Sequence, residues 1–142
     1  MSNVRLEKFK KEDALFIQKF NCLLDNDIQN IENLIRNWQT SLGFCIIYNN
    51  EKVGFISLSE KENRTLSWGI GIIEDMRGKG IGQEAFKLIL SEAKKRGYKK
   101  IISSCTKENI ASKRLHEKVG FKLIKEEINA VGHCMCRWEM DI

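Results

Sequence analysis

Three glycines and two cationic residues are concentrated near the middle of this chain of 142 residues, between Arg77 and Gly82. The six residues read Arg-Gly-Lys-Gly-Ile-Gly, with a β-branched run before them and apolar residues at helical spacing after them. Such a loop leaves the first N–H groups of a helix without partners, and the helix dipole adds partial positive charge there. Glycines allow the backbone to approach a ligand, and cationic side chains attract anions. The stretch therefore predicts a phosphate-binding loop, with a plain surface turn as the alternative.

The loop differs from two other nucleotide-binding motifs. It lacks the Gly-Lys-Ser/Thr ending of a P-loop. It also lies in mid-chain, and the strand that follows does not end in an acidic residue, as a dinucleotide-binding fold requires.

A second polar segment, Asn109–Phe121, reads Asn-Ile-Ala-Ser-Lys-Arg-Leu-His-Glu-Lys-Val-Gly-Phe. It is similar to the pattern Asn-x-x-Ala/Ser-x-x-Leu-Tyr-x-x-x-Gly-Phe, and the loop Arg77–Gly82 is similar to Arg/Gln-x-x-Gly-x-Gly/Ala. These are two signature segments of the GNAT superfamily of acyl-CoA N-acyltransferases, found here in the family's order and spacing. The chain therefore resembles this family over roughly residues 44 to 141.

The resemblance implies that the loop binds acetyl-CoA as a cosubstrate, without a metal. Backbone N–H groups from Arg77 to Gly82 would hold the pyrophosphate. The strand edge Ile70–Ile73 would pair with the pantetheine arm, and a backbone amide near Ile72 would face the thioester carbonyl. Asn109 would hydrogen-bond the pantetheine or order a water molecule. The cofactor-binding residues predicted in this way are Ile70, Ile72, Ile73, Arg77, Gly78, Lys79, Gly80, Ile81, Gly82, Asn109, Ser112 and Arg114.

Two residues of the second segment, Asn109 and His116, are predicted to be catalytic. Where the family has a tyrosine that protonates the leaving thiolate, this chain has His116. An imidazole can also donate a proton, because its reference pKa lies near 6.5, but it is shorter than a tyrosine side chain. A histidine that faces solvent at the end of a helix is the alternative interpretation.

The general base is a second departure from the family pattern. Many relatives carry a glutamate in the strand that leads to the loop, whereas residues 64–71 contain no carboxylate. Glu60 and Glu62 come earlier, and Glu74 and Asp75 come later, so each would have to act through a chain of water molecules. Otherwise the amine arrives deprotonated or loses its proton to ordered water.

The chain has five cysteines, an odd number scattered through strand-like and helical segments. This distribution favours free, buried thiols in a reducing compartment, and we expect a cytoplasmic protein. Cys134 and Cys136 stand beside His133, but their spacing is not that of a metal-ligand pair, so we predict no metal site. Cys105 ends a strand beside the expected cleft, where a structural thiol is favoured over an acyl-cysteine intermediate.

Length and composition are those of a single globular domain over residues 1–142, with 42% hydrophobic and 30% charged residues. Apolar runs fall short of the roughly 20 residues needed to cross a bilayer, and a signal peptide is not apparent, so we expect no membrane association. The net charge of +5 leaves a nucleic-acid-binding protein as one alternative. Because groove-reading motifs and interleaved aromatic residues are absent, we expect the charge to serve a polyanionic cofactor instead.

Hydrophobic periodicity predicts a mixed α/β protein with the order β-α-α-β-β-β-α-β-α-β-β. That is the order of the GNAT fold, with about six to seven strands in a mixed central sheet and four helices. In the family, the strand before the glycine loop and the strand after the long helix splay apart to admit CoA. The expected strands are residues 3–9, 44–48, 53–58, 64–73, 100–105, 121–127 and 130–140, and the expected helices are residues 10–20, 27–38, 80–97 and 109–118.

These features predict an N-acetyltransferase that moves an acetyl group from acetyl-CoA directly to a primary amine. The amine is either a small molecule or a protein N-terminus. The resemblance also implies a possible homodimer in which the last two predicted strands, residues 121–127 and 130–140, pair between subunits. The alternative is a non-catalytic acyl-CoA sensor, which the missing tyrosine and glutamate would favour.

Overall fold

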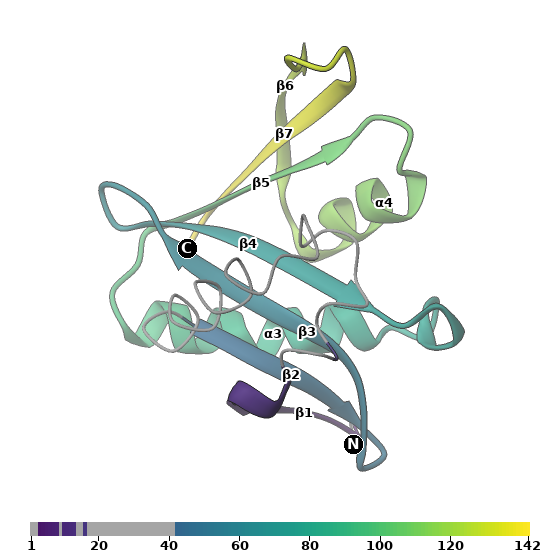
Figure 1. Cartoon of the computed structure of the whole chain (residues 1–142). Coiled ribbons are helices and arrows are strands. Elements are labelled where there is room, and N and C mark those ends of the chain that lie inside the picture. Colours follow the sequence, from purple (N-terminus) through teal and green to yellow (C-terminus); the bar gives the residue numbers. More distant parts are fainter. Residues whose placement is uncertain (1–2, 9, 14–15, 17–41) are drawn as a thin grey trace.

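The computed structural model describes residues 3–8, 10–13, 16 and 42–142 of the protein. Its strands form one mixed sheet in the order β1-β2-β3-β4-β5-β7-β6 (Figure 1). Strands β4 and β5 pair in parallel, whereas the other neighbours pair antiparallel. The strands are β1 (Val4–Lys8), β2 (Leu42–Tyr48), β3 (Glu51–Glu60), β4 (Thr65–Ile72), β5 (Lys100–Thr106), β6 (Lys122–Ile128) and β7 (Cys134–Asp141).

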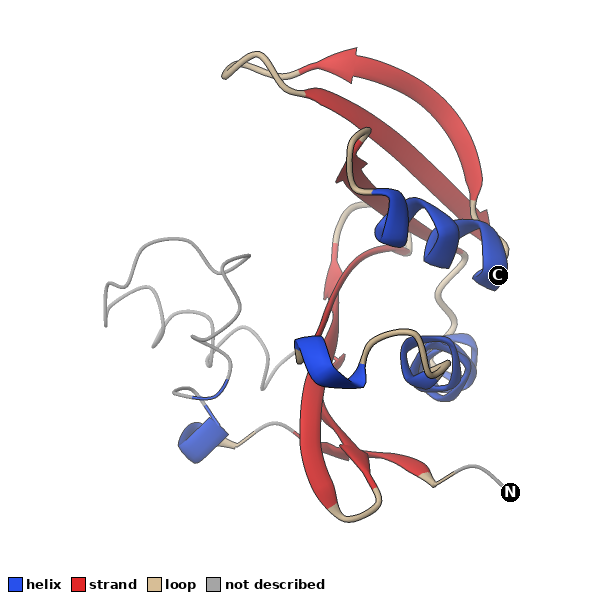
Figure 2. Ribbon diagram, turned by 90° about the vertical axis from the view of Figure 1, so that its right-hand side faces the viewer, coloured by secondary structure: helices blue, strands red, loops and turns tan. Residues whose placement is uncertain are grey.

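Helices α3 (Ile81–Lys95) and α4 (Ile110–Val119) lie on the same face of the sheet (Figure 2). The rings of Phe86 from α3 and His116 from α4 both contact the indole of Trp68 on β4, so the two helices share one core. Two short 3-10 turns complete the described elements, η1 (Lys11–Asp13) and η2 (Glu74–Met76). Among the described helices, none combines the length and apolar composition that a membrane span requires.

The buried stripe of α3 explains how this helix packs on the sheet. Ile81, Ala85, Ile89 and Ala93 repeat every four residues and are all at most 2% exposed. Leu88 also fits the helical spacing of these apolar residues, but it is 45% exposed and Phe86 is buried instead. The stripe drifts around the helix, because four residues turn the chain by slightly more than one full turn. Phe86 lies on the side toward which the stripe drifts, and Leu88 lies on the opposite side.

The sheet opens between its two parallel strands. Strand β4 pairs with β5 only from Thr65 to Ser67, opposite Lys100 to Ile102. Beyond that point β4 stays with β3 and β5 stays with β7, so the two strands diverge (Figure 1). The splay that the family resemblance implied is therefore present, and beyond it the facing edges of β4 and β5 pair with no other strand of the described residues.

The predicted strands and the helices after the loop are all present, with ends that mostly differ by one to three residues. The last strand was expected from residue 130 but begins at Cys134. The Oδ1 atom of Asn129 accepts hydrogen bonds from the amides of Val131 and His133, and this turn delays the strand. The helices predicted over residues 10–20 and 27–38 lie outside the described residues, apart from positions 10–13 and 16.

Gly54 on β3 allows the backbone of β4 to come unusually close. A Cβ atom at this position would lie 2.2 Å from the backbone oxygen of Gly71, so one strand would have to move. Overpacking of this kind costs about 1–3 kcal/mol. We expect Gly54→Ala to lower the free energy of unfolding by this amount, as measured by urea denaturation followed by circular dichroism.

Gly69→Ala on β4 is the matched control. A Cβ atom there would meet the Oγ of Ser57 at 3.6 Å, an ordinary contact. If the Gly54→Ala and Gly69→Ala proteins were equally stable, the close approach of β3 to β4 would not constrain the sheet.

Candidate active site

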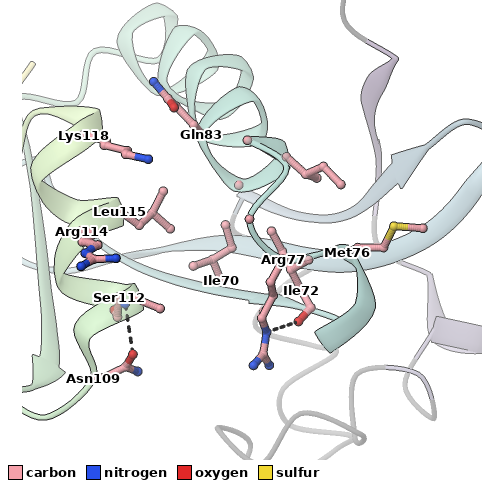
Figure 3. A pocket seen from close by; sticks show the side chains of 16 residues that line it. Ile70, Ile72, Met76, Arg77, Gln83, Asn109, Ser112, Arg114, Leu115 and Lys118 are labelled. Atoms are coloured by element: carbon pink, nitrogen blue, oxygen red, sulfur yellow. Dashed lines mark hydrogen bonds between the residues drawn. The ribbon is translucent and has the colours of Figure 1, made fainter.

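A cavity of about 490 Å³ lies where β4 turns away from β5. Its walls are the end of β4, the loop from η2 into α3 and one face of α4 (Figure 3). The two sequence segments singled out above, which are distant in the chain, therefore meet across one cavity. Among the described residues, no group of three or more His, Cys, Asp or Glu side chains is placed to hold a metal ion.

The glycine loop forms one end of the cavity and begins helix α3. Gly78 and Gly80 have φ angles of +78° and +79°, and a Cβ atom at either would meet nothing within 4 Å. Gly80 is the N-cap of α3 and has no side-chain oxygen to accept from the first N–H groups of the helix. The positive end of the helix dipole is thus open to an anion in the cavity.

Arg77 ties this loop to the end of β4. Its Nε atom donates a hydrogen bond to the carbonyl oxygen of Ile72 at 3.0 Å (Figure 3). The guanidinium is exposed and still lines the cavity, so it places a fixed positive charge beside the glycines.

Gly82 sets the distance between α3 and the other two walls. A Cβ atom on Gly82 would lie 3.2 Å from Cδ1 of Ile72, 3.4 Å from Cδ1 of Ile70 and 3.5 Å from Cδ2 of Leu115. A larger residue would push the helix away from β4 and α4. The three glycines therefore serve two purposes, since Gly78 and Gly80 shape the loop and Gly82 permits close packing.

Asn109 begins the α4 wall. Its Oδ1 atom accepts a hydrogen bond from the amide of Ser112 at 3.0 Å and so caps the helix, a role that asparagine commonly has at this position. The cavity is lined by Asn109, Ser112 and Arg114, and also by Lys118 one turn beyond Arg114. With Arg77, these two cations make the cavity suited to phosphate groups.

Of the predicted cofactor-binding residues, all but Ile73 and Lys79 line the cavity. Sequence reasoning missed six others, although their positions follow from their neighbours. Gly71 lies between two predicted residues of β4, Met76 and Gln83 flank the loop, and the remainder share the helical face of Ser112 and Arg114. These six residues are Gly71, Met76, Gln83, Ala111, Leu115 and Lys118.

His116 is buried behind the cavity wall and does not line the cavity. Only 3% of its surface is exposed, so the alternative of a solvent-facing histidine is wrong. Its ring stacks on Trp138 at 5.0 Å between centroids and contacts the rings of Trp68 and Phe121. Burial lowers the pKa of His116 and outweighs the hydrogen bond to the Ser112 carbonyl, which raises it.

Hydrogen bonds connect His116 to β5 and to its own helix. Nε2 lies 2.7 Å from the Oγ of Ser103 and 3.3 Å from Nε1 of Trp68. Nδ1 lies 2.7 Å from the carbonyl oxygen of Ser112, a residue of the cavity wall. The imidazole therefore connects Ser112 in the α4 wall with Ser103, the residue of β5 that follows its last pair with β4.

The remaining candidates for chemistry lie away from the cavity lining. Glu60, Glu62, Glu74 and Asp75 are all exposed, and none of them lines the cavity. Cys105 is buried and accepts a hydrogen bond from Nε1 of Trp138 at 3.3 Å. This contact fits the expected structural thiol.

Comparison with known proteins gives two results. The model of the acetyltransferase (GNAT) family matches residues 13–121. Among solved structures, an N-acetyltransferase from Staphylococcus aureus Mu50 superimposes with a TM-score of 0.82, at 23% identity over 99% of both chains. No relative was found among curated proteins.

Two further solved structures from Salmonella typhimurium have the same fold. One is yncA with its cofactor acetyl-CoA (TM-score 0.78, 16% identity, 98% of this chain and 94% of that chain). The other is an acetyl transferase that modifies the N-terminal serine of ribosomal protein L7/L12 (TM-score 0.80, 15% identity, 100% of this chain and 96% of that chain).

The capping bond of Asn109 can be separated from any contact with a ligand. Asparagine and aspartate are equally good N-caps, whereas alanine at an N-cap costs about 0.5–2 kcal/mol. We expect Asn109→Ala to lower the free energy of unfolding by this amount and Asn109→Asp to leave it unchanged, both measured by urea denaturation. Equal losses in the two variants would show that the cap does not stabilise α4.

Proposed function

Because the chain belongs to the GNAT family of acetyltransferases, we propose that it transfers an acetyl group from acetyl-CoA directly to a primary amine. The observation that carries this proposal is the open N-terminus of α3. Its positive-φ glycines and first N–H groups face a cavity that is also lined by Arg77, Arg114 and Lys118. This arrangement is complementary to the phosphates of a CoA thioester.

In the proposed complex, the backbone of the loop from Arg77 to Gly82 holds the pyrophosphate, with Lys79 at its outer side. The pantetheine arm then runs along the edge of β4 from Ile73 back to Ile70, because β5 no longer pairs with that edge. An added strand of this kind is held by main-chain hydrogen bonds, and a backbone amide near Ile72 polarises the thioester carbonyl. Asn109, Ser112 and Arg114 contact the cofactor from the opposite wall.

Catalysis then needs a neutral amine near the carbonyl and a proton for the leaving thiolate. The sequence predicts that His116 is the acid, but its imidazole lies behind the cavity wall. In this proposal, a proton that His116 supplies must therefore pass through a neighbouring hydroxyl group.

The acceptor is either a small-molecule amine or a protein N-terminus. The acetyl transferase of the same fold from Salmonella typhimurium modifies the N-terminal serine of ribosomal protein L7/L12, which supports a protein N-terminus as the acceptor. Free cysteines at Cys45, Cys105, Cys134 and Cys136 support a reducing compartment such as the cytoplasm. A homodimer through the closing strands stays a prediction.

A sensor that binds acyl-CoA without turnover is the second candidate function. This function is favoured by the lack of a carboxylate base in the cavity lining. The carboxylates that flank β4 in the sequence do not line the cavity, namely Glu60, Glu62, Glu74 and Asp75. The same cavity serves both functions, so turnover with an amine distinguishes them.

The decisive test is release of free thiol from acetyl-CoA in the presence of polyamines, amino acids, aminoglycosides and short peptides. We expect at least one amine to accelerate thiol release, and calorimetry to show binding of CoA alone. Binding without amine-dependent release would favour the sensor. Absence of CoA binding would contradict both functions.

Gly80→Leu tests the loop. The side chain would enter the open space beside the first N–H groups of α3, and we expect the Kd for CoA to rise about 100-fold or more, as measured by calorimetry. Gly132→Leu is the matched control, since Gly132 also has a positive φ of +89° and open space around it but lies in the β6–β7 turn. Equal CoA affinity in the two variants would contradict the loop assignment.

A further inference from the structure

A chain of hydrogen bonds joins β4, β5 and α4 beside the cavity. The indole Nε1 of Trp68 on β4 donates to the Oγ of Ser103 on β5. That oxygen lies 2.7 Å from Nε2 of His116 on α4, whose Nδ1 lies 2.7 Å from the carbonyl oxygen of Ser112. Ser112 takes part through its backbone carbonyl, and neither Trp68 nor Ser103 has been assigned a role in the proposed reaction so far.

The partners of the imidazole fix its tautomer. A carbonyl oxygen can only accept, so Nδ1 of His116 carries a proton and donates it to Ser112. An indole nitrogen can only donate, and Nε1 of Trp68 also donates toward Nε2 at 3.3 Å, so Nε2 is unprotonated and accepts. The hydroxyl of Ser103 therefore donates to Nε2 and simultaneously accepts from Trp68.

This arrangement gives Ser103 the surroundings of an activated hydroxyl. A base accepts its proton, a carbonyl orients that base, and an N–H group faces its oxygen. The rings of Trp68, Phe121 and Trp138 enclose the imidazole, which is 3% exposed. The base is thus shielded from water, while Ser103 itself is only half-buried.

Ser103 does not itself line the cavity, but it lies where β4 and β5 begin to diverge. The parallel pairing of β4 with β5 ends at Ser67 and Ile102, so Ser103 is the first residue of β5 beyond the point of divergence. In the proposed complex, the pantetheine arm runs from the glycine loop along β4 in the direction of this point of divergence.

We propose that Ser103 is a catalytic proton carrier of the acetyl transfer and that His116 is the base that acts through it. This inference rests on the proposed function. The relay supplies both a base for the amine and an acid for the thiolate, because the same two residues act on each in turn.

The relay balances over the reaction. The amine nitrogen forms a bond to the acetyl carbon, and a proton of that nitrogen passes to the Oγ of Ser103 while the hydroxyl proton passes to Nε2 of His116. The C–S bond then breaks, and the sulfur keeps the electron pair. Nε2 returns its proton to Ser103, whose other proton passes to the thiolate, so the products are the amide and free CoA.

Ser103→Ala removes the carrier, and general acid–base catalysis is worth about 100-fold to 10,000-fold. With acetyl-CoA and the amine of the panel that gives the fastest thiol release, we expect kcat to fall at least about 100-fold. The Kd for CoA should stay within about threefold of wild type, because the phosphates are held elsewhere. Ser103→Thr retains a hydroxyl and should restore most of kcat.

Ser104→Ala is the matched control. This residue neighbours Ser103 on β5 but is exposed, and alternate residues of a strand point to opposite faces. Its kcat should equal that of wild type. A Ser103→Ala protein with the kcat of the Ser104→Ala protein would overturn the relay.

His116→Gln tests the base, because a glutamine oxygen accepts from Ser103 but cannot take its proton. We expect the same loss of kcat with unchanged CoA affinity. If this variant fails to fold, ¹⁵N NMR of His116 in the wild-type protein provides the test. We expect Nδ1 to be protonated and Nε2 to be unprotonated. We also expect the ¹⁵N chemical shift of Nε2 to change in Ser103→Ala. A proton on Nε2 of the resting enzyme would overturn the proposal.

Wild-type turnover separates this inference from the proposed function. An inactive wild-type protein would contradict the enzyme and the relay together, whereas an active one with an unaffected Ser103→Ala variant would contradict the relay alone. Mass spectrometry after incubation with acetyl-CoA should show no acetylated Ser103. An acetyl-serine adduct formed at the rate of turnover would replace the relay with a covalent route.

Discussion

The short parallel pairing between β4 and β5 is the constraint on which the candidate site depends. After Ser67 and Ile102 the two strands follow different partners, and an extended ligand can use the edge of β4 that is left. The same divergence places the start of α3 and the start of α4 on either side of one cavity. Backbone hydrogen bonding, more than any single side chain, thus decides where a ligand can enter.

Close backbone approach is the second requirement of this geometry. The absence of a side chain at Gly54 lets β3 follow β4, and its absence at Gly82 lets α3 begin against Ile70 and Ile72. The dipole of α3 is consequently directed into the cavity at short range, where its effect on an anion is greatest. Cations from Arg77 and α4 add to this field. The loop needs glycine for its backbone conformation at Gly78 and Gly80 and for close packing at Gly82, and the sequence pattern alone does not distinguish these two needs.

The sequence predicted most of the described fold, because strands and helices here follow ordinary periodicity and capping. Asn109 was recognisable as an N-cap, and most of the predicted cofactor-binding residues line the cavity. Side-chain environment was harder to predict. Leu88 fits the apolar pattern of α3 yet is exposed, and His116 occupies a signature position yet lies in the core. Ser103 carries no sequence signal, since a serine within a strand gains meaning only from Trp68 and His116, which lie far from it in the chain.

In the proposed relay, the environment of His116 accounts for a histidine in place of the tyrosine of the family pattern. An imidazole is shorter, and here it lies behind the wall, but the hydroxyl of Ser103 extends its reach toward the splay of β4 and β5. Burial among aromatic rings disfavours the imidazolium, as the lowered pKa of His116 indicates. A proton taken from the amine would therefore be held only briefly and returned readily to the leaving thiolate. The apolar surroundings that remove His116 from the cavity therefore weaken it as a base and favour the return of the proton, the step in which it acts as an acid.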